Sequence, residues 1–256
     1  MPSVAVHATN LREVRSGLLE LLRPVVRLHA ELVDSWSVAI DTSDAKRRVR
    51  AGRPAFDAIE VLQGAGDLRK PFHRATQAFE RAGLASAESA LAARQQISDG
   101  VLALGASWIA GEPLPRQEPR RLAQRAAALV AGSVLAQLAG SIRSVVRHAR
   151  SDRTSCPACG SAAEFSMKTP QGRRLICARC DSSWITTRKG CVGCAADESP
   201  TVCRIPSPDL GYDLVVCNAC GRYLKERVGR GSGDLFVERG LTAQLDEAAE
   251  RRGLRL

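Results

Sequence analysis

Eight of the nine cysteines in this 256-residue chain occur as Cys-x-x-Cys pairs, and all nine lie after residue 155. The four pairs are Cys156-Pro-Ala-Cys159, Cys177-Ala-Arg-Cys180, Cys191-Val-Gly-Cys194 and Cys217-Asn-Ala-Cys220. Two intervening residues allow a tight turn to direct both sulfurs at one ion, so a tetrahedral site requires two such turns. Glycine follows the first and last pairs, where a residue with positive φ completes the turn most easily. The spacing therefore predicts two metal sites, each with four cysteine ligands.

The lengths of the intervening segments indicate which pairs share an ion. Seventeen residues separate Cys159 from Cys177, within the range of about 15–20 that is typical of four-cysteine zinc sites. Twenty-two residues separate Cys194 from Cys217, which is workable with an insertion. We therefore assign the first two pairs to one site (Cys156, Cys159, Cys177, Cys180) and the last two to another (Cys191, Cys194, Cys217, Cys220). An interleaved pairing stays open, although it requires longer loop closures.

Other readings of the cysteine pairs fit the sequence less well. A thioredoxin-like redox pair lies at the start of a helix after a strand, whereas these pairs lie between expected strands. Inert buried thiols have no reason to recur at this spacing. The ninth cysteine, Cys203, is expected to be a small apolar filler. All four histidines lie outside the cysteine-rich half, and the sequence has no phosphate loop, nucleophile elbow or paired-carboxylate motif. We therefore assign no catalytic residue and do not expect an enzyme.

The shift in cysteine content places a domain boundary near residue 150 and predicts an α+β protein. Residues 1–150 are expected to form a helical bundle. Asn10 and Glu13 have the pattern of a helix-capping box, and Pro24 either kinks that helix or begins a second one. An Ala-rich helix should begin near Pro119, with one apolar face formed by Leu122, Leu129, Leu138, Ile142 and Val145.

Short β segments separated by Gly and Pro turns make up the second half. Residues 164–167 and 173–176 flank a Thr-Pro-Gln-Gly turn, which predicts a hairpin. Further strands are expected at 184–188, 212–216 and 223–228, and a terminal helix at 241–252. We divide this half into two small rubredoxin-like, or zinc-ribbon-like, modules at 151–190 and 191–256, with the helix in the second.

Charge argues against nucleic acid as the partner. The formal charge is +10, of which residues 151–256 contribute 16 basic and 13 acidic side chains. Four thiolates around a divalent ion leave a site charge of −2, so two occupied sites bring this half to about −1. No basic segment followed by an apolar stretch opens the sequence, and no apolar run approaches the ~20 residues of a membrane span, so we expect neither a signal peptide nor a membrane anchor. We therefore expect a cytoplasmic protein without membrane insertion.

Motifs around the cysteines resemble those of FdhE-type formate dehydrogenase accessory proteins. The match begins with Cys-Pro-Ala-Cys-Gly-Ser at 156–161 and continues with Gly-Arg-Arg-Leu at 172–175 before the second pair. Trp184 and Arg188 precede the third pair, and Tyr-Leu-Lys at 223–225 follows the fourth. Leu241-Thr242, Leu245-Asp246 and the upstream Gly52-Arg53-Pro54 are similar as well. The chain departs from the family pattern at Val215-Val216 and at 237–240.

The resemblance implies a cytoplasmic, non-enzymatic assembly factor, or chaperone, that binds the catalytic subunit of a molybdenum- or tungsten-dependent formate dehydrogenase. It also implies iron in rubredoxin-type sites, whereas all-thiolate tetrahedral sites accept both iron and zinc. Two alternatives remain at this point: a nucleic-acid-binding zinc-ribbon protein and a rubredoxin-like electron carrier. A homo-oligomer is compatible with the sequence.

Overall fold

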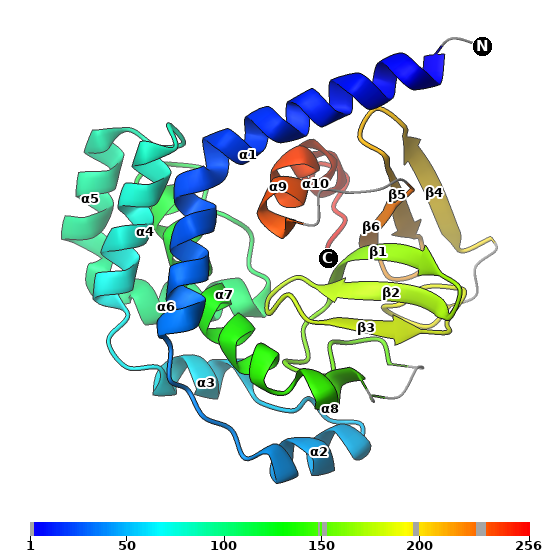
Figure 1. The fold of residues 1–256 in the computed structure, drawn as a ribbon, viewed down its shortest axis with the longest axis horizontal. Coiled ribbons are helices and arrows are strands. Elements are labelled where there is room, and N and C mark those ends of the chain that lie inside the picture. The colour runs from blue at the N-terminus through cyan, green and yellow to red at the C-terminus, as the bar shows by residue number, and fades with distance from the viewer. Residues whose placement is uncertain (1–2, 148, 150–152, 197–199, 229–233) are drawn as a thin grey trace. The chain divides into compact units, whose positions relative to one another are not determined.

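The structure, a computed structural model, describes residues 3–147, 149, 153–196, 200–228 and 234–256, without the side chains of residues 3–12 and Ser98. Helices occupy the first part of the chain (Figure 1). They are α1 (Ser3–Ser35), α2 (Thr42–Arg50), α3 (Ala58–Gly64), α4 (Arg69–Arg81), α5 (Ala87–Ile97), a 3-10 turn (Ser98–Gly100), α6 (Val101–Ala110), α7 (Arg120–Ser141) and α8 (Arg143–Arg147). The expected helical half is confirmed.

Local sequence explains several helix ends. The Asp41 carboxylate accepts a hydrogen bond from the Ser43 N–H at the start of α2, and Asp57 caps α3 in the same way. Gly111 ends α6 with φ of 84°, a conformation that glycine adopts without steric cost. The expected cap at Asn10 is wrong, because α1 begins at Ser3. The helix also continues through Pro24, so this proline does not begin a second helix.

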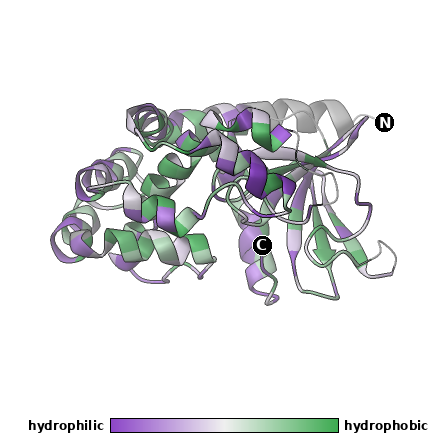
Figure 2. Ribbon diagram, turned by 90° about the horizontal axis from the view of Figure 1, so that it is seen from below, coloured by the Kyte–Doolittle hydropathy of each residue, from purple (hydrophilic) through white to green (hydrophobic). Residues whose placement is uncertain are grey.

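The Ala-rich helix α7 forms the core of the helical part. All five residues assigned to its apolar face or its continuation are buried: Leu122, Leu129, Leu138, Ile142 and Val145. Within the described residues, α7 alone is long and apolar enough to cross a membrane by length and composition, and 78% of its most apolar window is buried inside the protein. This burial is that of a core helix in a globular protein. Figure 2 shows hydrophobic and hydrophilic residues alternating along the helices, as expected when one face packs inward.

In the described part of the second half, six strands form one sheet in the order β3-β2-β1-β6-β5-β4 (Figure 1). The strands are β1 (Ala163–Thr169), β2 (Gly172–Cys177), β3 (Ser183–Thr186), β4 (Val202–Ser207), β5 (Tyr212–Cys217) and β6 (Tyr223–Arg227), followed by α9 (Leu235–Leu241) and α10 (Ala243–Glu250). Thr169 pairs with Gly172, so the predicted hairpin is confirmed. All neighbours are antiparallel except β1 and β6, which are parallel.

The two halves of this sheet repeat one arrangement. Each half contains a cysteine pair, two antiparallel strands, a second cysteine pair at the end of the middle strand, and a third strand. The first strand of the first half, β1, pairs with the last strand of the second half, β6. The expected modules 151–190 and 191–256 thus share a continuous sheet.

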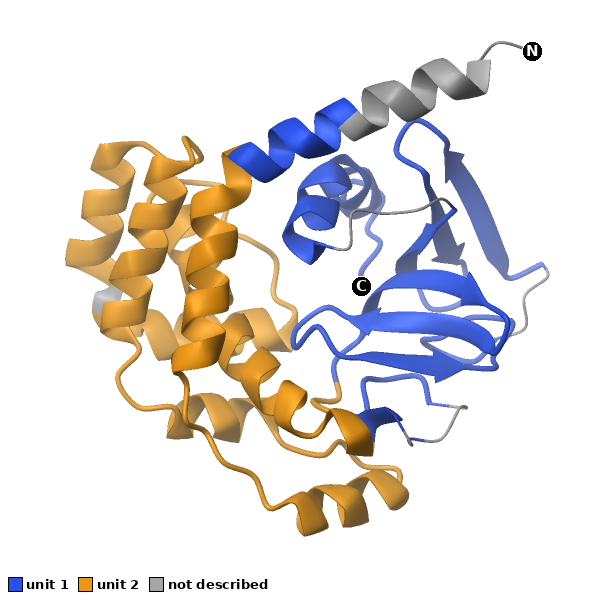
Figure 3. Ribbon diagram, viewed as in Figure 1, with its two compact units in different colours: residues 1–20, 146–157, 161–256 blue, residues 21–145, 158–160 orange. Residues whose placement is uncertain are grey.

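The chain divides into two compact units, shown in Figure 3. One contains residues 21–145 with Ala158–Gly160, and the other contains residues 1–20, 146–157 and 161–256. The helical unit thus ends at residue 145, and the start of α1 belongs to the sheet unit. In the sheet unit, Phe165, Ile176, Tyr212 and Leu241 belong to one hydrophobic cluster, which connects β1, β2 and β5 with α9.

Candidate metal centres

The first two cysteine pairs form one cluster. The sulfurs of Cys156, Cys159, Cys177 and Cys180 all lie within 4.8 Å of one another. The Sγ atoms of Cys156 and Cys180 are 3.6 Å apart, although the two cysteines are 24 positions apart in the chain. All four side chains are buried, and none is more than 8% exposed. We call this group cluster one.

The last two pairs form a second group, cluster two. The sulfurs of Cys191, Cys194, Cys217 and Cys220 also lie within 4.8 Å of one another. Two distances of 3.7 Å join the third pair to the fourth: Cys191 Sγ to Cys220 Sγ, and Cys194 Sγ to Cys217 Sγ. The structure thus brings together the two groups that the segment lengths indicate, rather than an interleaved arrangement.

These distances fit metal ligation and not disulfides. Sulfurs at about 2.3 Å from a tetrahedral ion lie about 3.8 Å apart, whereas a disulfide bond is about 2.05 Å long. The observed separations of 3.6 and 3.7 Å agree with the distance around a metal ion. Two clusters of this geometry, the only such groups in the described residues, could hold two metal ions. Four thiolates suit Zn²⁺ and rubredoxin-type iron alike, so the donor set does not distinguish these metals.

The same backbone turn occurs at all four pairs. The residue after each second cysteine has positive φ: Gly160 82°, Asp181 58°, Ala195 64° and Gly221 68°. The N–H of each first cysteine donates to the carbonyl oxygen five residues later, at N–O distances of 2.8–2.9 Å. The sequence predicted positive φ at the two glycines. Asp181 and Ala195 were missed, because a residue other than glycine gives no sign of a left-handed conformation.

Backbone N–H groups also donate to the sulfurs. The Gly193 and Cys194 N–H groups lie 3.2 and 3.5 Å from Cys191 Sγ, and the Arg179 N–H lies 3.4 Å from Cys177 Sγ. A hydrogen bond from the Ala196 N–H lowers the pKa of Cys194 to about 7. Such donors favour the thiolate, which is the form that binds a metal.

Burial acts in the opposite direction on other thiols of cluster two. It raises the pKa of Cys220 to about 12 and also raises that of Cys191. Four thiols at this spacing therefore do not all ionise by themselves at neutral pH. A divalent ion would displace their protons and supply the compensating charge.

A chain of buried and partly buried ion pairs connects cluster one to the terminal helices. Asp181, next to Cys180, accepts a hydrogen bond from Arg239 of α9 at 2.7 Å. Arg239 Nε also donates to Glu164 Oε2 of β1 at 2.8 Å. The other Glu164 oxygen is 3.0 Å from Lys225 Nζ of β6, which in turn is 2.8 Å from Asp246 of α10.

The charges in this chain depend on one another. Burial alone would raise the pKa of Glu164, but the positive charges of Arg239 and Lys225 hold it at about 2. Lys225 is completely buried, and it lies 4.5 Å from the centre of the Phe165 ring. Of these residues, Lys225 and Asp246 lie in the motifs at 223–225 and 245–246 that resemble the FdhE-type family. No local pattern identified Glu164 or Arg239, because sequence does not distinguish a buried charge from a solvated one.

A second set of buried carboxylates supports the centre of the sheet. Glu226 of β6 lies 3.2 Å from Arg173 Nε of β2 and 3.3 Å from the Ser166 hydroxyl of β1. Glu238 of α9 is fully buried and accepts a 2.5 Å hydrogen bond from the Tyr212 hydroxyl. Both networks fix the strands from which the cysteine turns project.

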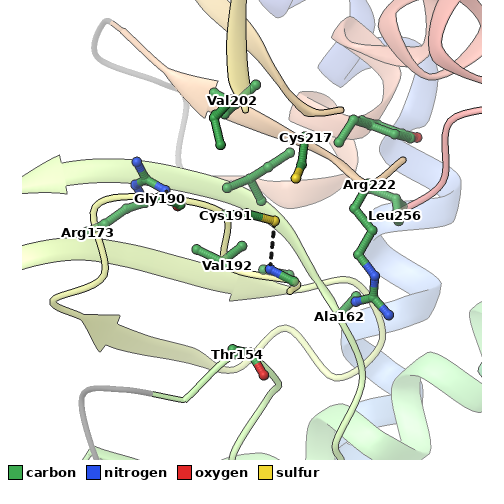
Figure 4. Close-up of a pocket in the computed structure, with 15 residues that line it drawn as sticks. Thr154, Ala162, Arg173, Gly190, Cys191, Val192, Val202, Cys217, Arg222 and Leu256 are labelled. Atoms are coloured by element: carbon green, nitrogen blue, oxygen red, sulfur yellow. Dashed lines mark hydrogen bonds between the residues drawn. The ribbon is translucent and has the colours of Figure 1, made fainter. Parts of the chain in front are cut away.

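A small cavity lies on the inner side of cluster two (Figure 4). The sulfurs of Cys191 and Cys217 border it, and Figure 4 marks the hydrogen bond from the Gly193 N–H to the Cys191 sulfur. Its volume is about 30 Å³, enough for one or two water molecules but far below the ~300 Å³ of a small-molecule site. This cavity is therefore part of the seam between the two halves of the sheet.

Comparisons with known proteins agree with this picture. No family model and no curated protein matches the sequence. Among solved structures, the FdhE protein from Pseudomonas aeruginosa is similar, with a TM-score of 0.65 and 21% sequence identity. The similarity covers 97% of this chain and 91% of that protein's chain. It supports the FdhE-type resemblance that the cysteine motifs indicate, and it shows that the chain has the FdhE fold.

Proposed function

We propose that this chain is an accessory protein for formate dehydrogenase, and that it binds the catalytic subunit of that enzyme. One observation carries the proposal: an FdhE-like fold spans 97% of the chain and contains both four-cysteine clusters. The motifs at 156–161, 172–175 and 223–225 support the same family. In this role the protein is cytoplasmic and acts as a chaperone rather than a catalyst.

The clusters serve as metal-stabilised scaffolds in this proposal. The ligands are Cys156, Cys159, Cys177 and Cys180 in one site and Cys191, Cys194, Cys217 and Cys220 in the other, each holding iron or zinc. Cys177 and Cys217 are the last residues of β2 and β5, so metal loss would disorder the surface that the sheet unit presents. The binding free energy of a structural site of this kind is about 10 kcal/mol or more.

Metal stoichiometry tests the scaffold first. Anaerobically purified protein should contain close to two metal ions per chain, with the eight cluster thiols alkylated more slowly than Cys203. Elemental analysis gives the number and identity of the ions, and mass spectrometry counts the modified thiols. A single tightly held ion, or eight freely reacting thiols in metal-loaded protein, would contradict the two-site assignment.

Capture of the partner tests the function. Tagged protein should recover a formate dehydrogenase catalytic subunit from extract. Deletion of the gene for the accessory protein should abolish formate oxidation without changing the transcript levels of formate dehydrogenase. Cys217→Ser should weaken capture because it removes a ligand of cluster two. Cys203→Ser is the matched control: this cysteine is exposed, lies on neighbouring strand β4 and belongs to neither cluster.

The same experiment separates the alternatives. Salt-sensitive recovery of DNA or RNA without the subunit would favour a nucleic-acid-binding ribbon. Electron transfer to a redox partner by the purified, iron-loaded protein alone would favour a rubredoxin-like carrier. Either result in place of subunit capture would refute the accessory role.

A further inference from the structure

The two clusters differ sharply in their access to solvent. Every cysteine of cluster one is buried. In cluster two, Cys191 and Cys217 are buried, but Cys194 is exposed and Cys220 is partly exposed. Sequence does not predict this difference, because all four pairs have the same spacing.

The exposure extends beyond the sulfurs to the turns that carry them. Ala195, Asn218 and Ala219 are all exposed, so solvent reaches the outer ends of both turns of cluster two. At cluster one, the first turn is buried throughout from Cys156 to Cys159, and Ala178 of the second is also buried. Cluster one therefore has the closed form of a structural site.

The inner side of cluster two is closed. Arg222 covers the third turn so tightly that a β-carbon on Gly193 would lie 2.6 Å from its Cδ. The cavity behind Cys191 and Cys217, at about 30 Å³, is too small for an incoming ligand larger than water. Cys191 is further held by two backbone N–H donors. An external group can therefore approach an ion at this site only from the side of Cys194 and Cys220.

We propose that cluster two is an open, exchangeable metal site, at which an external thiol replaces Cys194 as a ligand, whereas cluster one is a closed structural site. In this substitution the bond between the metal and Cys194 breaks and a bond to the incoming sulfur forms. The incoming thiol gives up its proton, the released Cys194 thiolate can take one up, and no electron is transferred. The proposal concerns the metal sites themselves and holds whether or not the chain serves formate dehydrogenase.

Zinc release kinetics test the proposal. Full-length Cys203→Ser protein, which lacks the exposed thiol outside the clusters, is loaded anaerobically with two zinc ions and mixed with the chromogenic chelator 4-(2-pyridylazo)resorcinol, with and without glutathione. One ion should leave about tenfold or more faster than the other, because the residues that surround the ligands differ between the two sites and changes in such surroundings alter metal affinity by about 10–100-fold. Glutathione should accelerate that phase alone.

Two further measurements identify the site. Limited alkylation with N-ethylmaleimide, followed by peptide mapping, should modify Cys194 before any cysteine of cluster one. Cys194→Ser should remove the fast phase and Cys156→Ser the slow one. If Cys194→Ser or Cys156→Ser does not fold, the order of alkylation mapped on the Cys203→Ser protein identifies the exchangeable site without them. Equal release rates, first modification at cluster one, or failure of cluster two to hold zinc would overturn the proposal.

Discussion

Replacing Lys225 with methionine should destabilise the sheet unit strongly. The Lys225 side chain is fully buried, and its ammonium group lies 3.0 Å from Glu164, whose side chain is only 7% exposed, and 2.8 Å from Asp246. Methionine retains most of the apolar volume but leaves both carboxylates without this cation. The perturbation therefore isolates the charge.

The contacts that remain in the variant determine how much stability it loses. Removing one member of a buried ion pair costs about 3–5 kcal/mol, because the other charge stays buried without compensation. Arg239 still pairs with Glu164, and the Tyr223 hydroxyl still donates to Asp246, so we expect the lower end, about 3 kcal/mol. At roughly 2–4 °C per kcal/mol, the melting temperature should fall by about 6–12 °C.

Lys168 provides a matched control for this measurement. It lies on β1, the strand beside β6, and pairs with Glu226 at 3.7 Å, but its side chain is 75% exposed. Lys168→Met should therefore have a small effect, as is usual for exposed pairs. The assay is thermal unfolding of both variants, loaded with metal and followed by circular dichroism. If Lys225→Met loses no more stability than Lys168→Met, the buried network does not stabilise the sheet unit as argued.

Three further predictions concern the clusters, pH and a turn. Cys156→Ser should release one metal ion and increase proteolysis within 156–190 while the helical unit stays folded; two retained ions would contradict the ligand assignment. The pKa of Glu164 is depressed to about 2. The ionised carboxylate therefore stabilises the folded state fully above pH about 4.5, and this stabilisation is lost as the pH falls toward 2. The difference in free energy of unfolding between the unsubstituted protein and Glu164→Gln, measured by denaturant titration, should shrink over this range. Gly172→Ala should destabilise the β1–β2 hairpin more than Gly211→Ala destabilises the β4–β5 turn. Both glycines have positive φ, but only at Gly172 would a β-carbon lie 2.6 Å from a backbone oxygen; equal unfolding midpoints would refute this.

Sequence predicted most of the cysteine-rich half because the signals there are local. A two-residue spacing defines each turn, and Thr169 to Gly172 defines a hairpin. Strand β4 was missed because it contains Pro206, which argues against a central strand. In the structure β4 is at the edge of the sheet, where a missing N–H donor is tolerated. Its place at the edge depends on pairings distant in sequence, which no local pattern reveals.

Features that depend on tertiary packing were not predictable. Helix α9 was not predicted, since the terminal helix was expected only from residue 241; the Asp234 side chain accepts from the Phe236 and Val237 N–H groups and caps it. The parallel pairing of β1 with β6 joins segments about 60 residues apart, as Phe165 opposite Lys225 shows. The partners of Glu164 follow from this pairing, which brings Lys225 of β6 to β1, and from α9, which supplies Arg239.

The pairing of β1 with β6 also has a consequence for self-association. Because the two halves of the sheet repeat one strand order, their junction is head-to-tail, and repeated junctions of this kind form an open filament unless they close into a ring. Edge strand β4 is equivalent to β1, and edge strand β3 is equivalent to β6, so the sheet ends in two surfaces that could in principle continue the same junction from molecule to molecule. Pro206 withholds a backbone donor on β4, and β3 is only four residues long. Proline at an edge and short edge strands are features by which natural sheets prevent edge-to-edge polymerisation, and each edge of this sheet has one of them.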